Sequence, residues 1–278
     1  MRRFLGGVVV AALLGIGLVL GALFLGLSPG ASWPGADPED RPLTALPQTA
    51  LPQAALPQAG PLRITAFGTS LTARGDWPVA LARALTTCLG RPVTVQRHAK
   101  PGAGSAWARG AVAAVAATRP DLVLMEFSIN DADIRDGISL SASRDNHRAV
   151  LADLGQRLPG ARVLLMTMSP AHGLRGIARP RLGAYYRIYH DLAAPPGTSD
   201  RGTSDRGASD RGASDPGASD RGGPYPGLID FTPRWRAMPA WRRALPDGLH
   251  PGAAEARAVM LPPLTGMIAR AAGGHCGD

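Results

Sequence analysis

Lysine is almost absent from this chain, and the basic residues do not cluster. Lys100 is the single lysine among 30 basic residues, and the formal net charge is +9. The arginines are scattered, with no basic helix and no alternation of basic with aromatic residues. This excess fits an arginine-favouring codon usage at least as well as a nucleic-acid-binding surface, so we expect no nucleic-acid partner.

Cysteine is nearly as scarce. The two cysteines, Cys88 and Cys276, fit an oxidising compartment. Cys88 ends the first helix predicted for the globular part, and Cys276 follows the last one. Helices in these positions often share one face of a doubly wound sheet, so a disulfide could join them. The alternative is one buried thiol and one exposed thiol in the tail.

One long apolar run occurs, at residues 4–27, and it carries no charge. A helix of this length spans about 36 Å, enough to cross a hydrocarbon core of about 30 Å, whereas a signal peptide has an apolar region of about 7–15 residues. Arg2 and Arg3 would keep the N-terminus cytoplasmic. We therefore predict a membrane anchor over residues 1–27, with the rest of the chain periplasmic or at the cell surface. The alternative is a signal peptide cut near Ala31 and a secreted protein.

Two low-complexity tracts flank the rest. Residues 28–60 repeat Ala-Leu-Pro-Gln at Ala45, Ala50 and Ala55, which forbids a helix and favours an extended linker. Residues 195–224 repeat Gly-Thr/Ala-Ser-Asp-Arg and contain no apolar residue larger than alanine, which predicts a disordered surface insertion. Calcium binding by its aspartates is a weaker alternative. About 190 residues remain, enough for one domain with a sizeable core.

Residues 61–278 alternate apolar strands with helices. The predicted strands are Leu62–Phe67, Pro92–Arg97, Asp121–Phe127, Arg162–Thr167 and Leu228–Phe231. The predicted helices are Trp77–Cys88, Ala106–Ala117, Arg144–Leu158, Arg181–Ala193 and Gly252–Ala271. This pattern predicts an α/β domain with a parallel, roughly five-stranded sheet covered by helices on both faces.

Chemistry-bearing residues follow the predicted strands. Ser70 comes directly after the first strand and Gly68, on the rim where open α/β sheets bind ligands. Near the C-terminus, Asp247 precedes His250 by three residues. A nucleophilic serine needs a base, and the base needs a group that fixes its tautomer, roles that His250 and Asp247 suit. Taken alone, a serine in such a turn is more often a turn or capping residue than a nucleophile.

Two further stretches should reach the same edge. Gly102, or failing that Gly104, lies in a glycine-lined turn that could present a backbone N–H to a developing oxyanion. Asn130 follows the third strand and could donate its side-chain N–H to the same oxyanion. Each residue also has an ordinary interpretation as a turn former.

Together these blocks resemble the SGNH (GDSL-type) hydrolase family. The order is Gly-x-Ser-Leu, a turn glycine, x-x-Asn-Asp and Asp-x-x-His-Pro, and the resemblance runs from Pro61 to about Ala271, apart from the Asp/Arg repeat. It implies a flavodoxin-like three-layer α/β/α domain that hydrolyses esters without a metal or organic cofactor. The Gly-x-Ser-x-Gly motif is absent, which disfavours the α/β-hydrolase fold.

The resemblance also implies a role for each residue. Ser70 takes the place of the nucleophile, Asp247 that of the acid and His250 that of the base. Gly102 and Asn130 take those of the oxyanion donors, with the N–H of Ser70 as a third donor.

Three positions depart from the family pattern. Thr69 stands where the family has an aspartate, which loses a carboxylate beside the nucleophile, while Ser128 replaces a glycine and Arg97 an asparagine.

Several other residues carry weaker signals. Asp131, Asp133 and Asp136 lack the spacing of a cation site and suggest a solvated loop. Trp235 and Trp241 suggest either a packed cap or an aromatic lip for a sugar or acyl chain. The remaining histidines receive no role: His98, His147, His172, His190 and His275.

The sequence therefore predicts a membrane-anchored serine esterase for small acyl esters. O-acetyl groups on carbohydrate are the preferred substrates, with lysophospholipids or thioesters next. The alternatives are an O-acyltransferase acting on a polysaccharide and a catalytically silent glycan-binding module. The oligomeric state is left open.

Overall fold

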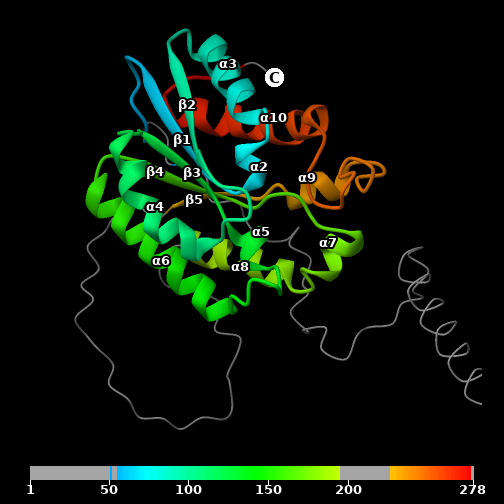
Figure 1. The fold of residues 1–278 in the computed structure, drawn as a ribbon. Coiled ribbons are helices and arrows are strands. Elements are labelled where there is room, and N and C mark those ends of the chain that lie inside the picture. The colour runs from blue at the N-terminus through cyan, green and yellow to red at the C-terminus, as the bar shows by residue number, and fades with distance from the viewer. Residues whose placement is uncertain (1–50, 52–54, 195–225, 277–278) are drawn as a thin grey trace, which may run out of the picture. The chain divides into compact units, whose positions relative to one another are not determined.

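The computed structural model describes residue 51, residues 55–194 and residues 226–276 (Figure 1). The predicted anchor at residues 1–27, most of the predicted linker and the Asp/Arg repeat at residues 195–224 lie outside the described residues, so those expectations stay predictions. Within the described ranges, no helix is both long and apolar enough to cross a membrane.

The core of the fold is a five-stranded sheet in the order β2-β1-β3-β4-β5. The strands are β1 (Leu62–Gly68), β2 (Val93–Ala99), β3 (Leu122–Glu126), β4 (Arg162–Met166) and β5 (Gly227–Ile229). Every neighbouring pair is parallel, which confirms the predicted sheet. The strand order is that of the flavodoxin-like doubly wound fold.

Strand composition follows position in the sheet. All five residues of β3 are buried, as expected for a central strand covered on both faces. β2 lies at the edge and carries exposed polar residues such as Thr94 and Gln96. Successive side chains of β3 alternate between faces, so Leu122 and Leu124 join one hydrophobic cluster while Val123 joins the other.

The longer helices form the two outer layers of the domain (Figure 1). One layer holds α3 (Trp77–Leu89) and α10 (Ala253–Ala271), and the other holds α4 (Ser105–Ala117), α6 (Leu140–Arg157) and α8 (Leu182–Ala193). α6 starts four residues earlier than predicted, because the hydroxyl of Ser139 accepts a hydrogen bond from the N–H of Ala142 (3.1 Å) and caps the helix.

Short helices follow the strand ends: α2 (Ser70–Ala73), α5 (Ser128–Asp131), α7 (Gly173–Ile177) and α9 (Thr232–Ala237). The sequence did not predict them, because one or two helical turns carry too few residues to show a periodic apolar pattern. Three of them directly follow β1, β3 and β5, at the carboxyl edge of the sheet.

The segment before β1 packs against the domain. Leu56 is buried, and its N–H donates to the carbonyl of Ala271 at the end of α10 (2.9 Å). Leu51 is also buried and joins the same hydrophobic cluster. Both leucines fall within the predicted linker, so the packed domain includes residues before Pro61.

A disulfide joins Cys88 to Cys276, with their Cα atoms 5.3 Å apart. Of the two arrangements that the sequence left open, the paired one is present. The bridge joins the last turn of α3 to the segment that follows α10. It therefore lies near the C-terminal ends of both helices, away from Ser70.

The topology places the candidate site residues together. β1 and β3 are neighbours, but the chain leaves β1 toward β2 and leaves β3 toward β4. Ligands bind at such a switch point, outside the carboxyl ends of the strands. Ser70 follows β1 and Asn130 follows β3, so the two residues flank the switch point.

Candidate active site

Ser70 is the first residue of α2, in a tight strand-to-helix turn. The hydroxyl of Thr69 accepts a hydrogen bond from the N–H of Leu71 (3.2 Å) and caps this helix. Gly68 is required just before it, because a Cβ at that position would lie 2.1 Å from Oε1 of Glu126. The turn leaves the Ser70 side chain at the wall of a cavity.

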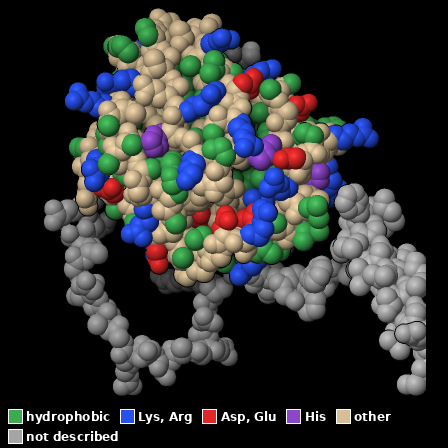
Figure 2. Space-filling model, viewed as in Figure 1, with side chains coloured by type: hydrophobic (Ala, Val, Ile, Leu, Met, Phe, Trp, Pro, Cys, Tyr) green, Lys and Arg blue, Asp and Glu red, His purple; other side chains and the backbone are tan. Residues whose placement is uncertain are grey.

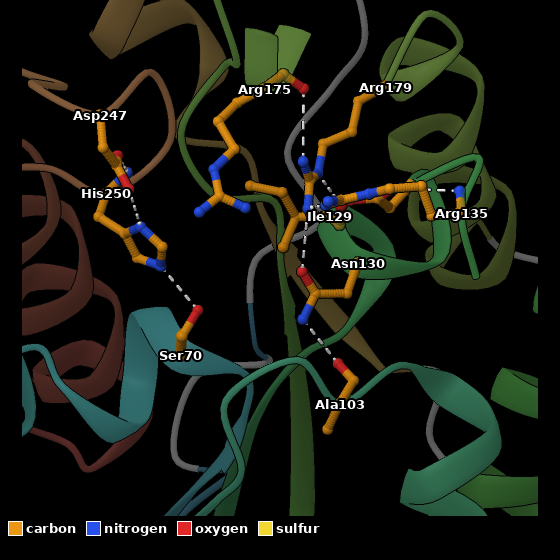
Figure 3. Close-up of polar contacts among 10 residues, drawn as sticks. Ser70, Ala103, Ile129, Asn130, Arg135, Arg175, Arg179, Asp247 and His250 are labelled. Atoms are coloured by element: carbon orange, nitrogen blue, oxygen red, sulfur yellow. Dashed lines mark hydrogen bonds and ion pairs between the residues drawn. The ribbon is translucent and has the colours of Figure 1, made fainter. Parts of the chain in front are cut away.

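Ser70, His250 and Asp247 form a continuous hydrogen-bonded chain (Figure 3). Ser70 Oγ lies 2.7 Å from His250 Nε2, and His250 Nδ1 lies 2.7 Å from Asp247 Oδ2. Because the carboxylate accepts from Nδ1–H, the imidazole keeps Nε2 free to accept from the serine hydroxyl. The three residues predicted to act together are therefore in contact in the required order.

The loop that carries Asp247 holds this carboxylate ionised. Burial alone would raise the pKa of Asp247. Hydrogen bonds from the backbone and ring of His250 and from the N–H of Leu249 outweigh that effect and lower the pKa to about 2. A carboxylate that stays ionised at neutral pH can orient the imidazole and stabilise its protonated form.

The same loop is fastened to the segment before α7. Gly248 has φ +85°, and a Cβ there would lie 2.4 Å from the carbonyl oxygen of His172, so glycine is needed on both counts. The N–H of His172 donates to the carbonyl of Gly248 (2.9 Å). The His172 ring lies near the carbonyl of Leu245, with Nε2 at 3.0 Å. His172, to which the sequence assigned no role, thus holds the loop that carries Asp247 and His250 in place.

Asn130 is buried, and its carboxamide is held at both ends. Nδ2 donates to the carbonyl of Ala103 (2.9 Å), and Oδ1 accepts from Nη2 of Arg179 (3.4 Å) (Figure 3). An amide nitrogen carries two hydrogens, so one N–H of Asn130 is left for a ligand. In the described part of the chain, the backbone N–H groups of Ser70 and Gly102 also donate to no protein acceptor.

The two candidate glycines differ in their surroundings. Gly102 has φ +76°, and a Cβ there would meet nothing within 4 Å, so its N–H lies in an open turn. Gly104 is the N-cap of α4, and a Cβ there would lie 2.4 Å from Oδ1 of Asp131. Gly104 therefore has a packing role, whereas nothing crowds the turn at Gly102.

Arg179 is a site residue that sequence reasoning missed. It is buried, its Nε donates to the carbonyl of Ile129 (2.8 Å), and its Nη2 pairs with Asp133 (2.9 Å). It thereby fixes both the backbone and the side chain around Asn130. No local signal marks this arginine among the many others of the chain, because its partners lie about 50 positions away in the sequence.

The solvated-loop interpretation is wrong for Asp131 and Asp133. Both are buried, and only Asp136 of the three is exposed. Asp131 accepts from the N–H of Ser105 (2.7 Å) and the hydroxyl of Ser143 (2.6 Å), which locks α4 and α6 beneath the site. Within the described ranges, no group of three or more His, Cys, Asp or Glu side chains could hold a metal ion.

Glu126 is a second missed residue and corrects the interpretation of Thr69. The carboxylate lost at position 69 is supplied from β3, since Glu126 accepts from the N–H of Thr69 (2.6 Å) and the hydroxyl of Thr72 (2.7 Å). Burial raises the pKa of Glu126 to about 7, against these hydrogen bonds, which lower it. No local signal marks this contact, because Glu126 lies 57 positions after Thr69 and comes opposite Gly68 only in the folded sheet.

A cavity of about 340 Å³ opens beside Ser70. It borders Ser70 and His250 but neither Gly102 nor Asn130. Its apolar wall is formed by Leu71, Trp77, Met168, Trp235, Ala256 and Met260.

The tryptophan segment is a packed cap rather than an open lip. Trp235 is only 1% exposed and presents part of its surface to the cavity. Trp241 packs edge-on against the ring of His172, with centroids 5.6 Å apart, and Arg242 lies over its face.

The other histidines lie outside the hydrogen-bonded chain. His147 Nδ1 lies 2.7 Å from the carbonyl of Ser143 and His190 Nε2 lies 3.1 Å from Asp230, both in the interior. His98 stacks on Trp107, and His275 is exposed in the tail.

This chain is similar to known proteins in sequence and in fold. The model of the GDSL-like Lipase/Acylhydrolase family matches residues 64–258. No curated relative matches the chain. Similar solved structures include the lipase/acylhydrolase from Enterococcus faecalis, with 18% identity and a TM-score of 0.53 over 78% of this chain and 99% of that one.

Two further structures show the same fold at low identity. Axe2, an acetylxylan esterase from Geobacillus stearothermophilus, is 14% identical, with a TM-score of 0.51 over 78% of this chain and 96% of that one. TesA is 19% identical, with a TM-score of 0.51 over 74% of this chain and 97% of that one. The family model covers more than half of the sequence and includes Ser70, Asn130, Asp247 and His250. The chain therefore belongs to the GDSL-like lipase/acylhydrolase family.

Proposed function

We propose that this protein is a serine esterase in which Ser70, His250 and Asp247 act as nucleophile, base and orienting acid. The observation that carries the proposal is the pair of 2.7 Å contacts from Ser70 Oγ to His250 Nε2 and from His250 Nδ1 to Asp247. These distances lie within the range over which a base takes a proton from a hydroxyl.

In the first half of the reaction, Ser70 Oγ attacks the ester carbonyl carbon while His250 Nε2 takes its proton. The developing oxyanion accepts from the backbone N–H groups of Ser70 and Gly102 and from the N–H of Asn130 that does not bond to Ala103. His250 then returns the proton to the leaving alcohol. In the second half, His250 deprotonates a water that attacks the acyl-enzyme, and it then returns this proton to Ser70 Oγ as the carboxylic acid leaves.

The proposed substrates are esters of small acyl groups. The apolar cavity beside Ser70 offers a place for the acyl group, and about 340 Å³ is more than an acetyl group fills. One similar structure is an acetylxylan esterase, so carbohydrate O-acetyl esters are the first to test. Lysophospholipids and thioesters come second, because the cavity wall would also suit a longer chain.

The proposed location is outside the cytoplasm, with residues 4–27 as a membrane anchor. This proposal rests on the length and hydrophobicity of that run in the sequence. A mature protein that begins near Ala31, measured by intact mass, would instead indicate a cleaved signal peptide and secretion.

The full-length chain in detergent micelles allows a direct test with p-nitrophenyl acetate, butyrate and decanoate. Ser70→Ala is compared with the wild type and with Ser141→Ala, an exposed serine on α6. Activity that is lost only in Ser70→Ala supports the proposal, and the chain-length profile separates the acetyl from the lipid assignment.

Equal rates for all three proteins would refute the serine esterase. Transfer of the acyl group to an added oligosaccharide in preference to water would point to an acyltransferase. Glycan binding without turnover, unaffected by Ser70→Ala, would point to a binding module.

A further inference from the structure

Arg175 is a cationic side chain at the candidate site that the proposed reaction does not use. It is half-buried on the short helix α7. In Figure 3 its guanidinium lies between His250 and Asn130 and points toward the side of Ser70. The basic side chains visible in Figure 2 are otherwise spread among hydrophobic and polar ones, so Arg175 stands out by its place rather than by a general basic patch.

No counter-charge neutralises Arg175. In the part of the chain that the structure describes, its guanidinium forms neither a hydrogen bond nor an ion pair. The nearby charges are already matched: Arg135 and Arg179 both pair with Asp133, and Asp247 bonds to His250. The positive charge of Arg175 is therefore available to a ligand.

The backbone of Arg175 is anchored beside the loop that carries Asp247 and His250, although its guanidinium is free. Its carbonyl accepts from Nη1 of Arg179 (3.3 Å), and its Cβ lies 3.5 Å from where a Cβ of Gly248 would be. The residue is thus positioned against the loop that carries Asp247 and His250.

A second unmatched arginine borders the cavity. Arg74, the C-cap of α2, is exposed, borders the cavity and forms no ion pair among the described residues. The carboxylate of Asp76, which also borders the cavity, is paired with Arg257. Among the residues that border the cavity, the carboxylates of Asp76 and Asp247 are both paired, whereas Arg74 is not.

We propose that Arg175 binds a carboxylate or phosphate on the alcohol half of the substrate, so that the enzyme prefers anionic esters. This inference rests on the proposed function, since it specifies the substrate of the same site. A guanidinium matches the geometry of both oxyanions with paired N–H donors. The apolar wall disfavours a charge, which assigns the acyl group to the cavity and the anion to the side of Arg175.

An isosteric substrate pair tests the proposal. 3-Acetoxybenzoate carries a carboxylate on the alcohol half, and 3-acetoxybenzamide replaces it with a neutral amide of nearly the same shape. Initial rates are measured for the full-length wild type, for Arg175→Gln and for Arg148→Gln, an exposed arginine on α6 that serves as the matched control. Acetate release is followed by pH-stat at low and at high salt.

The wild type should cleave the benzoate with a kcat/KM about 10- to 100-fold above that of the benzamide, the effect of one hydrogen-bonded charge pair. Arg175→Gln should abolish this preference by slowing the benzoate alone, and Arg148→Gln should keep it. High salt should reduce the preference of the wild type.

Three results would overturn the proposal. The first is a wild type with no preference for the anion, and the second is an Arg175→Gln variant that slows both esters equally, as an oxyanion-stabilising role would. The third is cleavage of p-nitrophenyl acetate but of neither acetoxy compound. Failure to cleave any ester, p-nitrophenyl acetate included, would instead refute the esterase itself.

Discussion

The contact between Arg179 and Asn130 predicts that a buried arginine controls an oxyanion donor without touching the substrate. Arg179→Lys keeps the positive charge next to Asp133 but cannot also donate to the carbonyl of Ile129 and to Oδ1 of Asn130, as the guanidinium does. The carboxamide of Asn130 would then be held only at Ala103, through Nδ2.

The size of the effect follows from what Asn130 itself contributes. Removing one oxyanion donor costs about 10²–10³ in kcat, so Asn130→Ala sets the ceiling. The contact from Arg179 to Asn130 is long, at 3.4 Å, and the bond to Ala103 remains. We therefore expect Arg179→Lys to lower kcat about tenfold, or about 1.4 kcal/mol of barrier, with KM little changed because the ground-state ester depends less on the donor.

The assay is a double-mutant cycle on p-nitrophenyl acetate hydrolysis with Arg179→Lys, Asn130→Ala and the combined variant. If Arg179 acts through Asn130, adding Arg179→Lys to Asn130→Ala should cost little more. Because Arg179→Lys disturbs a buried ion pair, it could also destabilise the fold. Melting temperatures of all four proteins therefore check that each rate comes from folded protein. A tenfold loss that persists in the Asn130→Ala background would refute the reasoning.

Other perturbations have definite expectations. Asp247→Asn should lower kcat by about 10⁴, because the amide no longer holds the His250 tautomer, and a loss below tenfold in steady-state assays would contradict that role. For Glu126, the folded-state pKa of about 7 exceeds the ordinary value of 4.5, so the folded chain keeps a proton that the unfolded chain releases, and stability falls as pH rises between these values. Glu126→Gln should remove about 3 kcal/mol of this decrease in the free energy of unfolding between pH 4 and pH 8. Urea denaturation at several pH values measures it, and the same pH dependence of the unfolding free energy in the wild type and the variant would disprove the expectation. Replacing Cys88 and Cys276 together by serine should lower stability by up to about 5 kcal/mol while sparing kcat, and unchanged unfolding midpoints would count against the bridge.

The sheet and the hydrogen-bonded chain through Ser70 were predictable from sequence because their signals are local. Apolar runs such as Leu122–Glu126 mark buried strands wherever they occur, and parallel strands bring their carboxyl ends to one edge. Asp247 and His250 lie three residues apart, so their contact depends on one loop.

The support beneath the site was not predictable, because it depends on pairs far apart in sequence. Glu126 reaches Thr69 across two neighbouring strands, and Arg179 reaches Asn130 and Asp133 from a different loop. The burial of Asp131 and Asp133 depends on those partners, so the same residues read as a solvated loop when the partners are unknown.

The packing of Leu56 on Ala271 fixes where the chain enters the domain. Leu56 contacts the far end of α10 just before β1 begins at Leu62, whereas Ser70 follows the opposite end of β1. A strand of seven residues is about 23 Å long. Leu56 and Ser70 therefore lie at opposite ends of the parallel strands. A substitution in the segment before β1 would therefore reach Ser70 only through the full length of that strand.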